Sequence, residues 1–556
     1  MDNLAEFLAT LDPDNREFNA AVEFVQSTDR PIYLTGRAGT GKTTFLKYVT
    51  AISSKKTVVV APTGVAAINA GGVTIHSFFK LPFEPLRPDD TRFSTRKMSE
   101  DHVNIFEMLK YNREKSQIIR ELELLIIDEI SMVRCDVLDA IEYILRVYRD
   151  KPYLPFGGVQ VLMLGDPFQL PPVMKREEQA ILGAYYKTLY FFSSNVFKII
   201  KPAQLELKKI YRQKNQQFVE LLNKVRFNQM TSDDIALLNR RHVPNFKPKV
   251  EENYIQLSTT NKRVDEVNEN KLKALKTDER KYEGLVEGIF PTSFMRTQEN
   301  LALKIGAQIM TVINDPGTVP SDDGADQYTS KKFFNGSIGT ILELHEDHIV
   351  ISTESHEYIA VYRTTWTNIS YRWHPERKTI VSEEIGAFTQ IPVRLAWAIT
   401  VHKSQGLTFD KVIADINGAF TNGQAYVALS RCTSLEGLVF KHLFNPRAIK
   451  TDPIVVYFSQ YYDQKSQNEQ DLLNGKADYF YKLARKAFFN YGFLECQECL
   501  SNAVSYRNDV QHPLFDKCKR IYLEWINQRE LLLNDAQQEN LNILKQYLKQ
   551  ELNIKI

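Results

Sequence analysis

A short apolar segment near the N-terminus runs directly into a glycine-rich loop. Residues 31–34 read Pro-Ile-Tyr-Leu, and residues 36–43 read Gly-Arg-Ala-Gly-Thr-Gly-Lys-Thr. The loop matches the pattern G-x-x-x-x-G-K-[ST] between a strand and a helix, which is the arrangement that binds nucleotide phosphates. Its glycines let the backbone turn tightly, so that several N–H groups face one anion. The chain is therefore expected to fold around a parallel α/β sheet with a triphosphate at its edge.

Each residue of this loop has a distinct part in holding the nucleotide. A helix expected to begin near Lys42 points the positive end of its dipole at the phosphates, and the Lys42 ammonium reaches the β- and γ-phosphates. The Thr43 hydroxyl suits Mg²⁺, so ATP and Mg²⁺ are the expected ligands. The predicted nucleotide-binding residues of the loop are Gly36, Ala38, Gly39, Thr40, Gly41, Lys42, Thr43 and Thr44.

The composition is that of an ordinary soluble protein with several domains. A length of 556 residues suggests three or four domains at ~150 residues each. The net charge of +2 does not by itself demand a polyanionic partner. Five cysteines predict a reducing compartment and no disulfide framework. The N-terminus lacks the features of a secretory signal, and no apolar run is long enough to span a membrane, so we expect a cytoplasmic protein, nucleoid-associated if bacterial.

Apolar segments and helical patterns alternate through the first two hundred residues. Short, nearly continuous apolar runs are typical of parallel strands that are buried on both faces. Such strands are predicted at 31–35, 57–61, 122–128 and 159–165. The alternation predicts a doubly wound α/β domain over 1–200. Residues 80–118 interrupt it as a small insertion, with a proline-rich segment at 81–88 and a polar helix at roughly 101–118.

The rest of the chain divides into a second α/β domain, an insertion and a helical tail. The second α/β domain covers 201–290 and 391–460. Between these segments, residues 291–390 carry closely spaced strand-like runs and turn signals, which predict a small β-barrel with an exposed loop at 317–332. The runs are at 305–312, 337–343, 348–352, 357–363 and 391–394. Residues 461–556 have few glycines and prolines and helical spacing, so they are predicted to be all-helical.

A buried strand that ends in two acids supplies the other half of a nucleotide-hydrolysing site. Residues 124–127 are apolar, and Asp128 and Glu129 follow them. Asp128 is predicted to hold Mg²⁺ directly or through water, and Glu129 to polarise the attacking water. Such a pair taken alone is often only a solvated strand end. The phosphate loop upstream makes the hydrolytic interpretation the favoured one.

The segment at 165–173 reads Gly-Asp-Pro-Phe-Gln-Leu-Pro-Pro-Val and follows another apolar strand. Gln169 is an uncharged donor and acceptor, suited to contact a γ-phosphate or its water. The prolines stiffen a loop, and Pro172 and Val173 are predicted to contact a second ligand. The alternative for this segment alone is a turn that ends in proline.

Two segments after the strand at 57–61 are candidates for contact with a sugar-phosphate backbone. They contain small residues and hydroxyls at the carboxyl end of a strand, which suits a polynucleotide. The candidate residues are Thr63, Gly64, Val65, His76 and Phe78. Phe78 is the candidate for stacking on a base, although paired phenylalanines are more often part of a core.

The order of these segments resembles superfamily-1B helicases of the Pif type (petite integration frequency). The matching segments are 36–43, 61–67, 74–79, 125–132, 155–160, 165–173, 210–213, 398–409 and 424–438. They span about residues 1–445 in order, and the resemblance is specific because several unrelated segments agree. It implies two RecA-like motor domains, 1A with a wedge insertion 1B and 2A with an inserted SH3-like barrel 2B. The helical C-terminal extension lies outside the resemblance.

The resemblance also implies roles that spacing alone does not give. Arg212 and Arg431 are similar to the two arginines that reach the γ-phosphate from the second domain, where a planar cation neutralises charge and senses closure. With these, the implied catalytic residues are Lys42, Glu129, Gln169, Arg212 and Arg431. The family has an adenine-reading glutamine just before the first helix. This chain has Asn19 at that spacing, and Asn19 is the implied nucleotide-binding residue there, with a shorter reach than glutamine.

The segment at 401–406, Val-His-Lys-Ser-Gln-Gly, resembles the one that links nucleotide to DNA. The resemblance implies that His402, Lys403 and Ser404 bind the DNA strand and that Gln405 and Gly406 lie nearer the phosphates. Two further residues that bind the DNA backbone are implied at Thr260 and Asn261.

The helical tail contains a single C-x-x-C at 496–499. A zinc site needs a second pair of ligands, so two cysteines buried on a helix are the favoured interpretation. The aromatic residues of the tail are interpreted as core. A protein-binding or DNA-binding role for the tail is a hypothesis.

The sequence and the resemblance together favour an ATP-dependent DNA helicase that translocates 5′→3′ on single-stranded DNA. Its expected partners are single-stranded and forked or partial duplex DNA, and it is expected to act as a monomer. The resemblance places it in replication, recombination or repair, with telomere maintenance as a family-level role. The alternatives are an RNA-directed helicase, a RecD-type repair subunit and a nucleotide-switched DNA-binding scaffold.

Overall fold

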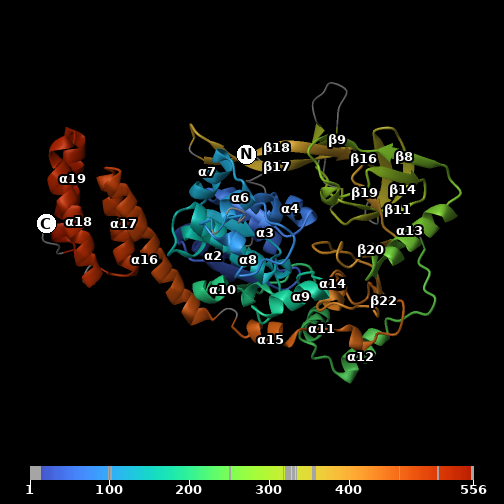
Figure 1. The fold of residues 1–556 in the computed structure, drawn as a ribbon. Coiled ribbons are helices and arrows are strands. Elements are labelled where there is room, and N and C mark those ends of the chain that lie inside the picture. Colours follow the sequence, from blue (N-terminus) through green and yellow to red (C-terminus); the bar gives the residue numbers. More distant parts are fainter. Residues whose placement is uncertain are drawn as a thin grey trace.

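The computed structural model describes residues 14–552, apart from short gaps. The gaps are at 98, 100–102, 214, 250–251, 317, 320–326, 329–331, 334, 354–357, 378, 462–463 and 510–511. Two parallel α/β domains lie next to each other, a β-rich region extends from the second, and a group of helices projects from the first (Figure 1).

The first domain is built on a six-stranded parallel sheet in the order β3-β2-β4-β5-β1-β6. The strands are β1 (Ile32–Gly36), β2 (Thr57–Ala61), β3 (Val73–Thr74), β4 (Leu124–Ile127), β5 (Gln160–Leu164) and β6 (Ala203–Leu207). The four predicted strands correspond to β1, β2, β4 and β5. Alternate residues of one strand enter different cores: Tyr33 packs into one, and Ile32 and Leu34 into the other. Burial on both faces explains the continuous apolar runs.

The boundary between the two domains lies later than residue 200. β6 pairs in parallel with β1, from Ile32↔Ala203 to Gly36↔Leu207, so it belongs to the first sheet. The second sheet has the order β20-β7-β21-β22 and is also parallel. Its strands are β7 (Ile255–Ser258), β20 (Ala398–Thr400), β21 (Val412–Asp415) and β22 (Leu438–Phe440). Because β20 pairs with β7, the β-rich region between them is an insertion within the second domain.

The insertion in the first domain contains two short helices where the sequence predicts one. They are α6 (Ile105–Leu109) and α7 (Arg113–Glu121). Lys110 ends α6 in a left-handed conformation, and Asn112 starts α7 by accepting the Lys115 N–H. An asparagine that caps a new helix inside a polar run is the signal that separates the two helices.

The β-rich insertion contains a five-stranded antiparallel sheet in the order β16-β15-β14-β11-β19. The strands are β11 (Gln308–Thr311), β14 (Ile338–Leu344), β15 (His348–Thr353), β16 (Ile359–Tyr362) and β19 (Val393–Leu395). All five coincide with predicted runs, and they enclose a core of their own. Most of the predicted loop at 317–332 lies outside the described residues.

A long hairpin in this insertion is not predicted from the sequence. β17 (Thr364–His374) and β18 (Thr379–Gln390) pair with each other, and β18 also pairs with β9 (Leu285–Gly288). The register shifts between Asn368 and Ile369, which breaks the two-residue period that would reveal a strand. The hairpin reaches the first domain, where the Tyr371 hydroxyl accepts a hydrogen bond from the Val59 N–H at 3.1 Å.

The C-terminal region is helical. It comprises α15 (Pro453–Ser459), α16 (Lys465–Phe489), α17 (Phe493–Tyr506), α18 (Pro513–Arg529) and α19 (Asp535–Gln550). α16 contacts α2 (Arg16–Ser27) of the first domain, and α17, α18 and α19 stand away from it (Figure 1). Among the described helices, none combines the length and the apolar character needed to cross a membrane.

Candidate active site

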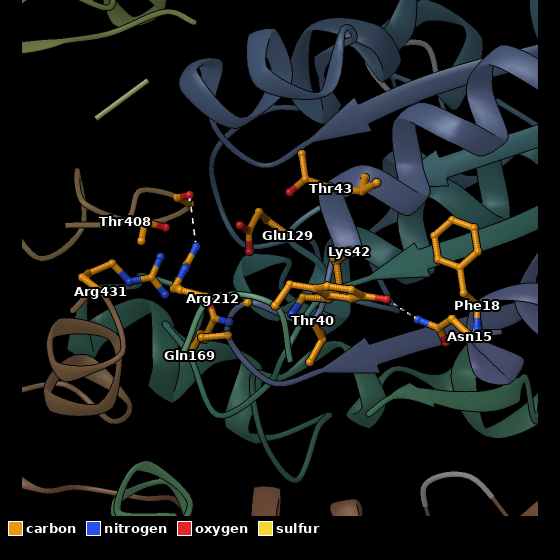
Figure 2. Close-up of a pocket in the computed structure, with 16 residues that line it drawn as sticks. Asn15, Phe18, Thr40, Lys42, Thr43, Glu129, Gln169, Arg212, Thr408 and Arg431 are labelled. Carbon is orange, nitrogen blue, oxygen red and sulfur yellow. Dashed lines mark hydrogen bonds between the residues drawn. The ribbon is translucent and has the colours of Figure 1, made fainter. Parts of the chain in front are cut away.

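One cavity of about 640 Å³ lies between the two α/β domains. Its lining residues come from strand ends, helix starts and loops of both domains. They are Asn15, Phe18, Ala38, Gly39, Thr40, Gly41, Lys42, Thr43, Thr44, Glu129, Gln169, Tyr211, Arg212, Gly406, Thr408 and Arg431. Figure 2 shows Arg212 and Arg431 at one end, Lys42 in the middle, and Asn15 and Phe18 at the other end. The cavity is therefore long, with a strongly cationic end.

The glycine-rich loop has the backbone geometry that phosphate binding requires. Gly39 and Gly41 have φ angles of 83° and 89°, which favour glycine. α3 (Lys42–Ile52) begins directly after Gly41, and no side chain caps it. Its first N–H groups are therefore free to bind an anion. The Lys42 ammonium donates to the carbonyl oxygens of Gly36 and Arg37 at 2.6 and 3.1 Å, so Gly36 contributes through its backbone.

The two acids at the end of β4 have raised pKa values. Burial, with the Asp128 charge next to it, raises the pKa of Glu129 to about 7. Burial also raises the pKa of Asp128 to about 6. Glu129 has a φ of 50°, a conformation that is uncommon outside glycine. A carboxyl with a pKa near neutrality, held in a cavity by a strained backbone, is suited to act as a general base.

Two guanidinium groups lie close to each other, that of Arg431 buried and that of Arg212 half-buried. Arg212 donates to the Ser430 carbonyl at 3.3 Å, and Arg431 donates to the Val427 carbonyl at 3.0 Å. Burial and the charge of Arg431 lower the pKa of Arg212 to about 9, and burial lowers that of Arg431 to about 10. These two cations repel each other and are partly removed from water. A ligand with several negative charges would stabilise both of them. A triphosphate fits this requirement.

Hydrogen bonds cross the cavity from one domain to the other. The Gln405 side chain donates to the Glu129 carboxylate at 2.9 Å, and the Ala38 N–H donates to the Tyr426 hydroxyl at 3.3 Å. Gln405 belongs to the segment at 401–406. Glu129 therefore has a direct contact with the segment that the resemblance links to DNA.

The prediction for Asn19 is wrong. Asn19 is exposed on α2 and does not line the cavity, whereas Asn15 does and is buried. Asn15 is the residue just before α2, and its side chain accepts the Phe18 N–H and donates to the Tyr211 hydroxyl at 3.0 Å (Figure 2). The error arises because α2 begins at Arg16, earlier than the sequence spacing suggested.

The predicted metal ligands lie at the cavity or near it. Thr43 lines the cavity, and the charge of Lys42 contributes to the pKa of Asp128. In the part of the chain that the structure describes, no three His, Cys, Asp or Glu residues form a metal cluster. The residues fit Mg²⁺, which takes only one or two protein oxygens and completes its shell with phosphate and water. Cys496 and Cys499 are buried free cysteines.

The predicted DNA contacts lie on both domains. Thr63 caps α4 (Gly64–Ala70), His76 lies in α5 (Ile75–Phe79), and Thr260 precedes α13 (Asn261–Ala274). Exposed side chains among these predictions are Val65, Val173, Thr260, Asn261 and Lys403, and His402 is half-buried. A Cβ at Gly64 would overlap the Phe294 ring of the inserted region, so the start of α4 is covered on that side.

Three of the predicted DNA contacts are buried. Phe78 is 2% exposed and packs edge-on against Phe79, so the prediction of base stacking is wrong. The Ser404 hydroxyl donates to the Val401 carbonyl and has no exposure. Pro172 is also buried, and the exposed residue of that loop is Val173.

Sequence reasoning missed several residues of the site. Phe18, Tyr211 and Thr408 line the cavity, and Phe83 is an exposed aromatic residue that stacks on His76 with ring centroids 4.5 Å apart. Tyr211 directly precedes Arg212, which was the available signal. Nothing in the local pattern marks Phe83 as exposed.

Comparison with known proteins gives consistent relatives. A family model described as PIF1-like helicase matches residues 11–234. The human ATP-dependent DNA helicase PIF1 is 31% identical over 463 residues, which cover 81% of this chain and 64% of the human protein. The chain thus spans a little under two thirds of that relative's length.

This chain matches solved structures of related proteins over a larger share of those proteins' length. Bacteroides sp. Pif1 in complex with ADP-AlF4 is 38% identical, with a TM-score of 0.72, and the match covers 82% of this chain and 97% of that one. Bacteroides Pif1 bound to single-stranded DNA is 39% identical, with a TM-score of 0.54, and covers 81% and 97%. The motif order, the two parallel sheets with their shared cavity and these matches agree, and this chain belongs to the PIF1-like helicase family.

Proposed function

We propose that this chain is an ATP-dependent DNA helicase, which moves along single-stranded DNA and unwinds duplexes. The observation that carries the proposal is the cavity between the two parallel sheets, where the phosphate loop, Glu129, Arg212 and Arg431 converge. The human relative is named an ATP-dependent DNA helicase, and the Bacteroides relative binds single-stranded DNA.

ATP fits the cavity in one direction. The base lies toward Asn15 and Phe18, and the γ-phosphate lies toward Arg212 and Arg431, since these pairs line opposite ends (Figure 2). The arginines neutralise charge as the γ-phosphate leaves, because a guanidinium remains charged even when buried.

The attacking water is activated by Glu129. Its pKa of about 7 leaves it largely ionised above neutral pH, so it accepts a proton from water near the γ-phosphate. Gln169 lines the same cavity and orients that water or the phosphate. Thr43 and Asp128 would hold Mg²⁺, which neutralises phosphate charge when bound.

Hydrolysis is coupled to movement through the segment at 401–406. Gln405 contacts Glu129, and His402 and Lys403, two or three residues away, are the DNA contacts. Loss of the γ-phosphate changes the contacts of the arginines, so the two domains separate and alter their hold on the strand. The 5′→3′ direction is expected from the family.

The proline-rich segment at 81–88 is the proposed pin that separates the duplex at a fork. Arg134 donates to the Phe83 and Glu84 carbonyls at 3.1 and 3.0 Å, which fixes the segment. The Phe83 ring is 78% exposed and is available to stack on the terminal base pair. Phe83→Ala should slow strand separation several-fold and leave DNA-stimulated ATP turnover unchanged. Equal unwinding rates for both proteins would remove Phe83 from this role.

ATP turnover with and without single-stranded DNA tests the proposed function. A helicase of this kind is strongly stimulated by DNA, whereas a nucleotide-switched scaffold is not. Turnover with single-stranded RNA separates the RNA-directed alternative. The DNA affinity should also fall with salt, with a log–log slope of ~0.7 per phosphate neutralised.

The remaining roles are proposals about partners. The helical region at 461–556 is proposed to recruit a protein, and forked DNA is the proposed substrate, in replication, recombination or repair. In one related structure two coordinating Pif1 helicases act at forked duplex DNA. We propose that one copy of this chain suffices, and the dependence of unwinding rate on protein concentration tests this: a second-order dependence would contradict it.

A further inference from the structure

A buried ion pair joins the two motor domains next to the catalytic cavity. Arg226 lies at the end of α11 (Gln216–Phe227) and is 2% exposed, and Asp166 follows β5 and has no exposure. The Arg226 guanidinium and an Asp166 carboxylate oxygen are 2.9 Å apart. Desolvation offsets most of the attraction within such a pair, so it is a weak source of stability. The position of the ion pair therefore indicates its role better than its contribution to stability does.

Asp166 organises the loop that carries Gln169. Its carboxylate accepts the Phe168 N–H at 3.2 Å, and its carbonyl accepts the Gln169 N–H at 2.9 Å. The second carboxylate oxygen is buried without a hydrogen bond among the described residues. Arg226 forms the ion pair with this carboxylate, while the charges of Lys42 and Arg431 interact with it without an ion-pair contact. The Arg226 guanidinium also lies over the Phe168 ring, 4.0 Å from its centroid.

The second domain contacts the same loop at another point. Gly423 is the N-cap of α14 (Gln424–Leu429), and a Cβ there would overlap the carbonyl oxygens of Phe168 and Gln169. α14 packs against α11 and leads directly to Arg431. Two elements of the second domain thus hold the Gln169 loop, and one of them positions an arginine of the cavity.

We propose that Arg226 is a positioning residue: through Asp166 it sets Gln169 in the catalytic cavity when the second domain closes. The inference rests on the proposed ATP hydrolysis. Because the loop is fixed to the second domain by charge and by close packing, a movement of that domain moves Gln169 with it. Removal of the charge on Arg226 breaks the ion pair of Asp166 with α11, so the loop loses its fixed relation to that helix.

A double-mutant cycle on the full-length protein tests the proposal. Arg226→Gln, Gln169→Ala and the double variant are compared for kcat and KM with saturating single-stranded DNA. Each single change should lower kcat on the order of 10-fold or more with little effect on the KM for ATP, and the double variant should match Gln169→Ala alone. If the two losses multiply, Arg226 acts independently of Gln169 and the proposal is overturned.

Control variants separate positioning from folding. Lys224 lies on the same helix, and its 44% exposed side chain pairs with Asp234 at 2.8 Å, so Lys224→Gln should leave kcat unchanged. Arg226→Lys keeps the charge and should recover part of the loss seen in Arg226→Gln, still without multiplying with Gln169→Ala. Full wild-type kcat in folded Arg226→Lys and Arg226→Gln would overturn the proposal. Wild-type turnover is measured first, so a chain that does not hydrolyse ATP is recognised as a failure of the proposed function itself.

Discussion

The cleft between the motor domains and the interface between α16 and α2 both use charged side chains, but in different surroundings. In the cleft, Arg431 is buried, and its pKa is lowered to about 10 by that burial. At the α16 interface, Lys482 pairs with Asp29 at 2.6 Å while its side chain is 55% exposed. Buried cations need a ligand or a partner, whereas exposed pairs are largely compensated by water. The cleft is therefore suited to chemistry, and the α16 interface to attachment.

Packing holds α16 in place more than its ion pairs do. Ala477 is fully buried, and Asn468 donates to the Gln204 carbonyl of β6 at 2.8 Å. Gly475 faces the first domain, where an added Cβ would lie 3.0 Å from an Arg30 side-chain carbon. The attachment therefore depends on close contact, and removal of the exposed Lys482 charge should alter it little.

The largest effect is expected from the centre of the cleft. Lys42→Ala should abolish ATP turnover because the β- and γ-phosphates lose their cation, and Glu129→Gln should abolish it because the water loses its base. Single-stranded DNA binding should persist in both. Turnover assays and DNA titrations check this, and substantial turnover in either variant would contradict the assignment.

Arg212→Ala should lower turnover on the order of 10³-fold, as expected of an arginine that stabilises the leaving phosphoryl group. ATP binding, measured by titration, should weaken far less. A near-normal rate would remove Arg212 from this role. It would also show that a charge in the cleft can be as dispensable as one at the α16 interface.

The pH dependence of turnover should report the burial of Glu129. Because its folded pKa is raised to about 7, the active ionised form is lost as the pH falls through 7. Well below that value, kcat should fall about tenfold per pH unit. The profile is measured from pH 5.5 to 8.5 at saturating ATP and DNA. A flat profile would show that this carboxyl does not limit the reaction.

Detachment of α16 should leave the chemistry nearly intact. Gly475→Leu places a side chain against Arg30 and Thr28, and such overpacking costs about 1–3 kcal/mol. Limited proteolysis should then release the C-terminal helices, while ATP turnover stays within about threefold of wild type because no cavity residue is touched. A large loss of turnover would make the helical region part of the motor.

The smallest effect is expected from a single exposed charge. Lys482→Gln should change the free energy of unfolding by no more than ~1 kcal/mol, because its side chain is 55% exposed and exposed ion pairs contribute little. Chemical denaturation measures this, and high salt should reduce the difference further. A loss of several kcal/mol would show that this pair behaves like the buried charges of the cleft.

The sequence predicts the elements that depend on short-range, repeating patterns of residues. Continuous apolar runs gave four strands of the first sheet, and the phosphate loop gave Lys42 and Thr43 at the cavity. What it missed depends on packing over long distances. Phe78 is in the core and Phe83 is exposed, although both are phenylalanines near the same insertion. A bulge hides the β17–β18 hairpin from the sequence pattern, and the spacing points to Asn19 because nothing in it marks the start of α2 at Arg16.

Strand displacement with ATP tests the central claim most directly. Duplexes that carry a 5′ or a 3′ single-stranded overhang are mixed with the wild-type chain and with Lys42→Ala. ATP-dependent release of the strand from the 5′-overhang duplex by the wild type, and none by Lys42→Ala, is the predicted result. No displacement by a wild-type chain that hydrolyses ATP, or equal displacement by Lys42→Ala, would contradict the account of a cleft that converts ATP hydrolysis into movement on DNA.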